Sequence, residues 1–266
     1  MLSDTELDGC RELIAELTAW ACDRIVAERP APDEIGTKTS AADWVTSTDL
    51  AVERHVRERI LERFPHHRVV GEEFGETGGG GVSWYVDPVD GTTNFVHGLP
   101  WSSFSVVVVD EDGAAAGAVA DPYRREVISA VRGEGAFAGG VRAHCSEADS
   151  LMGGIVLTEL VMQSLANGQL ELIAALADQG CVTRILGSNA LSLASAGVGR
   201  AAATVLWAYN LVDCQAGLLI AREAGARILA PPGGPALGQP FACVAPGVAD
   251  ALAALLPANA NVCTDP

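Results

Sequence analysis

The chain has 266 residues, 49% of them hydrophobic, so it can bury a large core as one elaborate domain or two tightly joined halves. Its net charge of −17 argues against a nucleic-acid partner, which would select a basic surface. No apolar run reaches the ~18–20 residues of a membrane span, and the acidic N-terminus lacks signal-peptide features, so we expect a cytoplasmic protein with no membrane partner.

Two amphipathic helices are predicted before the first strand. Asp4 or Thr5 can cap a helix that runs to about Glu28, and Thr48 or Asp49 can cap a second helix over residues 50–63. Taken alone, Asp49 is typical of a helix cap.

The segments around these helices are predicted to be short and polar. Residues 36–48 are expected to form a mobile loop, and residues 76–81 a flexible glycine-rich loop. Between them, residues 68–71 form a short strand that delivers Glu72 and Glu73, which alone would be solvated loop charges.

The most informative stretch is Asp87-Pro88-Val89-Asp90-Gly91-Thr92-Thr93-Asn94, which follows an apolar strand. Carboxylates at a strand end collect a hard cation. Backbone N–H groups of a Gly-Thr turn that opens a helix collect a phosphate. The combination predicts metal-assisted phosphate chemistry.

The remaining chain predicts strands and then alternating strands and helices. Three strands are expected over 104–109, 117–120 and 127–131, with a hairpin turn over 110–113. The later elements are a strand over 154–158, a helix over 165–178, a strand over 182–186, a helix over 188–198, a strand over 202–207, a helix over 213–224 and a strand over 227–230. This rhythm predicts sheets covered by helices in layers.

Four carboxylates lie at element ends and are candidates for a shared site: Glu72, Asp87, Asp90 and Asp213. Alone, Asp213 is typical of a helix cap, and Asp87 and Asp90 of turn residues. Two carboxylates about 4 Å apart repel by ~4 kcal/mol near a protein surface, so gathering them requires a divalent cation. All-oxygen ligands select Mg²⁺ or Mn²⁺ over zinc.

An ordered set of motifs resembles the inositol monophosphatase family of Mg-dependent, lithium-sensitive phosphomonoesterases. The set comprises Lys38-x-x-x-x-Asp43-x-Val45-Thr46-x-x-Asp49, then Gly71-Glu72-Glu73, then the stretch from Asp87 to Asn94, and finally Asp213-x-x-x-Gly217. The resemblance spans most of the chain. It implies an α+β fold, a layered αβαβα sandwich, in one phosphatase domain with a metal-binding half over 1–145 and a second half over 146–266.

The resemblance also implies roles for single residues. Glu72, Asp87 and the Val89 carbonyl would bind one Mg²⁺, and Asp87, Asp90 and Asp213 a second, with a third, weaker site near Glu72 and Mn²⁺ as a substitute. Asp49 and Thr92 would orient and deprotonate the attacking water, and the amides of Gly91 and Thr92 would hold the phosphate. Related proteins are usually homodimers.

The sequence departs from the family pattern in the segments expected to bind the leaving alcohol. The segment Gly187-Ser188-Asn189 would line the leaving-group pocket beside Asp90 and Asp213, although position alone favours an ordinary helix cap. Inositol-cleaving members usually have a glutamate where this chain has Leu206. Losing a charged hydrogen-bond partner costs about 1.5–3 kcal/mol, unless Leu206 is simply a core strand residue and a neighbour takes over.

We therefore expect a small-molecule phosphate ester other than inositol phosphate: a different polyol, sugar or amino-alcohol monophosphate. Histidinol phosphate and fructose bisphosphate are the alternatives that related members hydrolyse, and a 3′-phosphonucleotide fits less well. A non-catalytic regulatory protein that retains the fold is the alternative from another class.

Overall fold

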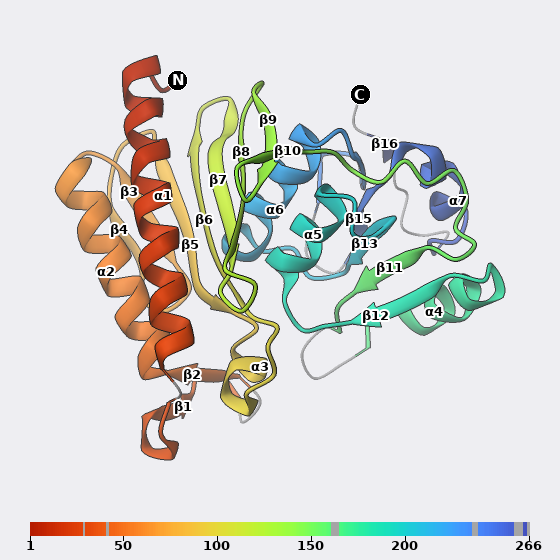
Figure 1. Cartoon of the computed structure of the whole chain (residues 1–266), viewed down its shortest axis with the longest axis horizontal. Helices are drawn as coiled ribbons and strands as arrows, with labels where there is room; N and C mark the ends of the chain where they lie inside the picture. The colour runs from red at the N-terminus through yellow and green to blue at the C-terminus, as the bar shows by residue number, and fades with distance from the viewer. Residues whose placement is uncertain (29, 41–42, 161–164, 236–238, 258–262, 265–266) are drawn as a thin grey trace.

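The protein is a sandwich of five layers in the order α–β–α–β–α, as the resemblance implied (Figure 1). The computed structural model describes residues 1–28, 30–40, 43–160, 165–235, 239–257 and 263–264. In the described part of the chain, no helix combines the length and apolar character needed to cross a bilayer.

The first sheet has eight strands in the order β10-β9-β8-β7-β6-β5-β3-β4. Its pairings are antiparallel except that β3 runs parallel to β5. Its strands are β3 (Arg68–Gly71), β4 (Gly75–Gly78), β5 (Ser83–Asp90), β6 (Ser103–Asp110), β7 (Gly113–Asp121), β8 (Glu126–Val131), β9 (Gly135–Ala138) and β10 (Val141–Ala143). The parallel pairing brings Gly71 opposite Val86, so Glu72 emerges beside the end of β5.

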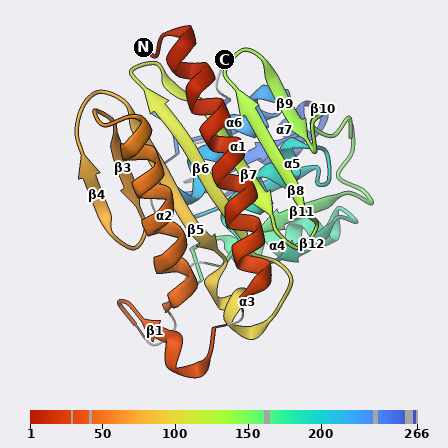
Figure 2. The same cartoon turned by 60° about the vertical axis from the view of Figure 1, so that its left-hand side comes forward.

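Helices α1 (Asp4–Ala27) and α2 (Ser47–Arg63) cover one face of this sheet (Figure 2). Their apolar stripes pack on alternate strand residues, and the resulting core includes Leu13, Val56 and Trp84. Both helices begin earlier than predicted. Ser3 and Thr46 are the N-caps, each in a capping box with the carboxylate three residues on, so Asp49 closes the box and is not itself the cap.

The second sheet has six strands in the order β12-β11-β13-β15-β14-β16. Its strands are β11 (Ile155–Thr158), β12 (Val182–Ile185), β13 (Ala203–Leu206), β14 (Arg227–Ala230), β15 (Phe241–Val244) and β16 (Cys263–Thr264). Helices α5 (Asn189–Gly197) and α6 (Leu211–Glu223) lie between the two sheets, while α4 (Gln169–Asp178) and α7 (Ala249–Ala253) cover the outer face (Figure 1). Single 3₁₀ turns occur at η1 (Pro32–Glu34) and η2 (Pro246–Val248).

Two predicted loops contain strands. Within 36–48, β1 (Ile35–Thr37) and β2 (Trp44–Thr46) form an antiparallel hairpin, with residues 41–42 outside the described chain. Within 76–81, the first residues belong to β4, whose residues are all exposed at the edge of the sheet. All three strands are held by backbone pairing, which leaves no periodicity of apolar side chains for a sequence pattern to detect.

Candidate active site

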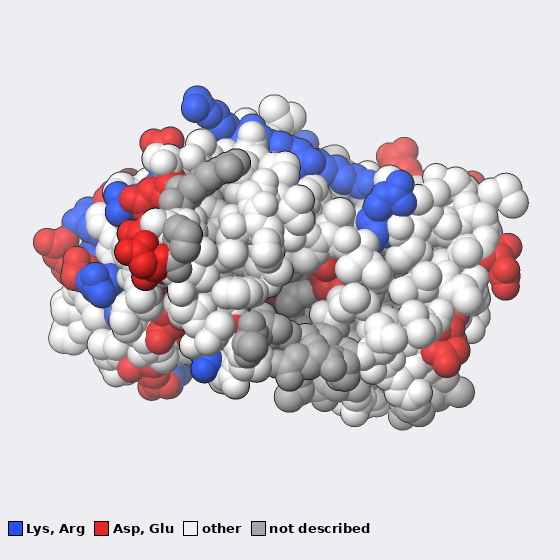
Figure 3. All heavy atoms as spheres, turned by 90° about the horizontal axis from the view of Figure 1, so that it is seen from below, with Lys and Arg blue, Asp and Glu red and all other residues white. Residues whose placement is uncertain are grey.

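The motif residues meet where β5 ends, beside the N-termini of α2, α5 and α6. A cavity of about 320 Å³ opens there. It is lined by Asp43, Trp44, Glu72, Asp90, Gly91, Thr92, Thr93, Asn94, Glu159, Leu160, Ile185, Gly187 and Asn189. Seen from below, the surface is hollowed near its middle, and acidic atoms are visible there (Figure 3).

Asp87 and Asp90 lie in the last four residues of β5, where the pairing with β6 shifts register. Both are buried, at 2% and 6% exposure. The amide of Val89 donates to Asp87 over 3.1 Å, which bends the chain between the two carboxylates. The bulge turns both carboxylates toward the same end of the sheet.

The Asp90 carboxylate is held mainly by the start of α5, about 100 residues further along the chain. It accepts bonds from the amides of Asn189 and Ala190 at 3.1 and 2.9 Å and from the hydroxyls of Ser103 (3.1 Å) and Ser188. Ser188 is also the N-cap of α5 and accepts from the Leu191 amide. Ser188 is thus the helix cap that its position indicated, whereas Gly187 and Asn189 on either side of it line the cavity.

Asp49 lies at the bottom of the site and is fully buried. One of its oxygens closes the capping box with the amide and hydroxyl of Thr46. The other lies 3.3 Å from the Thr92 hydroxyl, which is 3.0 Å from the Val89 carbonyl. The helix cap therefore fixes Asp49 in reach of Thr92, and the Thr92 proton has two acceptors.

Glu72 lies at the mouth of the site, in the turn between β3 and β4. The ammonium of Lys38 contacts both Glu72 and Glu73 at 2.6 Å. Burial by itself lowers the pKa of Lys38, but the two glutamates outweigh it and raise that pKa above its usual range. The Lys38 ammonium thus places a positive charge beside the Glu72 carboxylate.

Asp213 is in the first turn of α6, whose N-cap is Asn210. It receives bonds from the side-chain amides of Asn210 (3.0 Å) and Asn189 (3.4 Å). One turn later, a Cβ on Gly217 would lie 2.5 Å from the side chain of Leu193 on α5. Only glycine allows α6 to approach α5 this closely, which explains the Asp-x-x-x-Gly spacing.

The carboxylates repel one another. Burial, followed by repulsion from Glu72, Asp213 and Asp90, raises the pKa of Asp87 well above its usual value. Burial also raises the pKa of Asp90 to about 6, although its hydrogen bonds oppose the shift. For Asp213, burial and then the charges of Asp90 and Glu72 raise the pKa to about 8. Within the described residues, none of Asp87, Asp90 and Asp213 has an Arg or Lys within ion-pair distance.

Two further residues hold the segment before α5 and were absent from the sequence-based set of site residues. The side-chain amide of Asn94 donates to the carbonyls of Trp101 (2.7 Å) and Leu186 (2.6 Å). The buried carboxylate of Glu159, just after β11, accepts from the Gly187 amide (2.6 Å) and the Ser192 hydroxyl (2.7 Å). Asn94 could have been found from its place in the motif, whereas nothing local marks Glu159.

Leu206 ends β13 and is 1% exposed. It packs in a core cluster with Leu193, Cys214 and Phe241. It also borders a cavity of about 210 Å³, together with Glu159, Leu160, Asn189, Trp207, Ala208 and Asp213. Leu206 is therefore a core residue at the wall of this cavity, whose carboxylates are those of Glu159 and Asp213.

Comparison with known proteins is consistent with this geometry. Residues 11–261 match the model of the inositol monophosphatase family. The chain is 36% identical over 196 residues to the fructose-1,6-bisphosphatase/inositol-1-monophosphatase of Thermotoga maritima, covering 74% of this chain and 75% of that protein. It is 36% identical over 193 residues to the Nus factor SuhB of Haemophilus influenzae, covering 71% and 72%. The crystal structure of the extragenic suppressor protein suhB of Bartonella henselae superimposes with a TM-score of 0.88 at 24% identity, covering 94% and 99%.

Proposed function

The chain belongs to the inositol monophosphatase family, and on this basis we propose that it is a divalent-cation-dependent phosphomonoesterase that hydrolyses a small monophosphate ester. The observation that carries the proposal is the set of Asp87, Asp90 and Asp213. They are brought together from distant parts of the chain, and burial followed by repulsion among the carboxylates raises the pKa of Asp87 and Asp213. Such a set is stable at neutral pH when a cation is bound among the carboxylates.

The residues fit a pair of Mg²⁺ or Mn²⁺ ions by the chemistry of their donors. Glu72, Asp87 and the Val89 carbonyl would hold one ion, and Asp87, Asp90 and Asp213 the other. The position of Lys38 against Glu72 indicates that this corner favours positive charge. Among the described residues, no group of three or more such side chains has the spacing of a metal-binding set.

When bound, the ions would supply Lewis acidity, which makes water a better nucleophile at neutral pH and stabilises negative charge on the leaving oxygen. The side chains of Asp49 and Thr92 would orient that water, and Asp49 would accept its proton through the Thr92 hydroxyl. Burial raises the pKa of Asp49 to about 6, close to that of a useful general base. The water oxygen would bond to phosphorus as the ester P–O bond breaks, the leaving oxygen would take up a proton from solvent, and Asp49 would release the proton taken from water to solvent.

The leaving-group side favours an alcohol without a second phosphate. Among the described residues that line the smaller cavity, none is Lys, Arg or His, and two are the carboxylates of Glu159 and Asp213. A second phosphate would find no cationic side chain there, whereas a hydroxyl or ammonium could donate to the carboxyl oxygens. We infer a preference for a polyol, sugar or amino-alcohol monophosphate over fructose 1,6-bisphosphate. We also infer low activity on inositol phosphate, because Leu206 cannot accept a hydrogen bond and the nearby Glu159 carboxylate is already bonded to Gly187 and Ser192.

The test is phosphate release with Mg²⁺ from a panel of inositol 1-phosphate, glycerol phosphate, sugar monophosphates, histidinol phosphate, fructose 1,6-bisphosphate and a 3′-phosphonucleotide. We expect activity that EDTA abolishes and Mg²⁺ restores. Fructose bisphosphate or inositol 1-phosphate as the best substrate by kcat/KM would contradict the proposed preference. Release that EDTA does not affect would contradict the metal mechanism, and no release from any ester would favour a non-catalytic protein.

A further inference from the structure

Glu53 is a fully buried glutamate on α2 that the proposed reaction does not use. Its carboxylate accepts from the amide of Glu73 over 2.6 Å and from the amide of Phe74 over 3.1 Å. These two residues follow Glu72 in the turn between β3 and β4. A charged group without access to water is thus bonded to the backbone that carries a proposed cation ligand.

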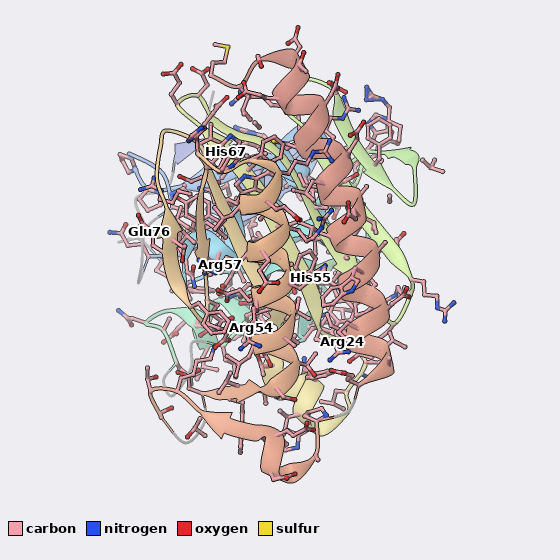
Figure 4. The ribbon with its side chains drawn as sticks, turned by 90° about the vertical axis from the view of Figure 1, so that its left-hand side faces the viewer. Arg24, Arg54, His55, Arg57, His67 and Glu76 are labelled. Carbon is pink, nitrogen blue, oxygen red and sulfur yellow. The ribbon has the colours of Figure 1, made fainter. Side chains whose placement is uncertain are left out.

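Arg57 lies one helical turn after Glu53 and completes the contact. Its guanidinium forms an ion pair with Glu53 at 2.6 Å. It also donates to the carbonyls of Val69 (3.1 Å) and Gly75 (2.7 Å), one on each side of the turn. In Figure 4, Arg54 and Arg57 project from α2 toward the β3–β4 hairpin. Arg54 stacks on the ring of Phe74, 5.6 Å from its centre.

Gly71 shows how closely the Glu53 carboxylate approaches the chain. A Cβ built on Gly71 would lie 2.1 Å from a Glu53 oxygen, so no side chain fits there while the carboxylate keeps its place. On the other side, the Glu72 amide is 3.3 Å from the Val86 carbonyl of β5. The backbone of Glu72 is therefore held between α2 and the strand that supplies Asp87.

Asp49, Glu53 and Arg57 are four residues apart along α2, so they share one face of the helix. Asp49 reaches Thr92 from this face, while Glu53 and Arg57 reach the Glu72 turn. A single rigid helix thereby sets the distance between the proposed base and the most exposed proposed ligand.

We propose that Glu53 and Arg57 are a positioning pair that holds Glu72 in place for a divalent cation. This rests on the proposed function, since it takes Glu72 to be a ligand. Loss of hydrogen-bonded support around a metal ligand typically lowers metal affinity by 10- to 100-fold. Because the support here acts through the backbone, the structure assigns the lower end of that range.

The test compares Glu53→Gln with Glu58→Gln, which removes an exposed glutamate from the same helix. Binding of Mn²⁺ is followed by the loss of the free-ion signal in electron paramagnetic resonance, without substrate. We expect Glu53→Gln to raise the Mn²⁺ dissociation constant about 10-fold and Glu58→Gln to leave it unchanged. In the phosphatase assay, the apparent Mg²⁺ constant should rise for Glu53→Gln while kcat at saturating Mg²⁺ stays within about twofold.

Several outcomes separate this proposal from the proposed function. A folded Glu53→Gln variant that binds Mn²⁺ like wild type would overturn the positioning pair alone. A wild-type protein that binds no Mn²⁺ would overturn the proposed function and the positioning pair with it. If Glu53→Gln fails to fold, Arg57→Lys keeps the charge but loses the fork that spans Val69 and Gly75, and it should also raise the dissociation constant; an unchanged constant would contradict the proposal.

Discussion

Replacing Ser188 by alanine tests whether the start of α5 fixes the Asp90 carboxylate. The Ser188 hydroxyl donates to Asp90 and accepts from the Leu191 amide as the N-cap of the helix. At pH 7, Asp90 is mostly ionised because its pKa is about 6, so the first bond is charge-assisted. Ser188 is 1% exposed, so water cannot replace either partner after the change.

The expected cost follows from these two bonds. A hydrogen bond to a charged group contributes about 1.5–3 kcal/mol, and an N-cap serine about 1 kcal/mol. Because Ser103 still donates to Asp90, we expect Ser188→Ala to lower the free energy of unfolding by about 2–4 kcal/mol. Ser195→Ala is the matched control, since Ser195 lies on the same helix at 2% exposure and its hydroxyl has no hydrogen-bond partner among the described residues.

The assay is urea unfolding of the metal-free protein at pH 7, followed by circular dichroism. Ser195→Ala should change the free energy of unfolding by less than about 1 kcal/mol, the cost of a hydroxyl that makes no bond. If Ser188→Ala is as stable as wild type, the contact of Ser188 with Asp90 does not stabilise the fold as the structure indicates. An equal loss in both would also refute the reasoning, because packing and not hydrogen bonding would then explain it.

Three further predictions concern the same site. Asp90→Asn should lower kcat by orders of magnitude in the phosphate-release assay with the circular dichroism spectrum retained, and near-wild-type turnover would refute its role as a ligand. Burial raises the pKa of Glu159 to about 7, so the fold favours its protonated form. The contribution of this group to the free energy of unfolding, measured as wild type minus Glu159→Gln, should be at its full value below about pH 4.5 and be lost as pH rises through 7. A difference in urea unfolding that does not vary between about pH 5 and 8 would contradict this. Gly91→Ala should destabilise the protein by more than Gly113→Ala in thermal unfolding, because both have positive φ but only at Gly91 would a Cβ lie 2.7 Å from the Gly187 carbonyl, and equal losses would count against that clash.

The first helices and strands follow from the sequence because their signals are local. The spacing of apolar residues predicts α1, α2 and the strands β5 to β8, with errors of a few residues at their ends. The caps were misplaced because several polar residues near each start could serve, and only the backbone conformation at Ser3 and Thr46 distinguishes them. The short strands β1, β2 and β4 depend on pairing with neighbours, which single segments do not encode.

The candidate site divides in the same way. The sequence by itself determined that carboxylates end β5 beside a Gly-Thr turn, since all of these residues lie within eight positions and their chemistry is independent of the rest of the chain. The fold decided which distant groups meet them. The bonds that Ser188 donates to Asp90, Asn94 donates to Leu186 and the Gly187 amide donates to Glu159 join residues 28 to 98 positions apart.

The fold also decided the environment of Leu206, which is buried at the wall of a cavity that Glu159 and Asp213 line with their carboxylates. No local pattern carries this information, because it arises when two sheets pack on α5 and α6 and bring loops from both halves to one end. Local sequence therefore specified what kind of atoms the site offers, whereas tertiary packing set the distances, burial and pKa values that decide how those atoms act.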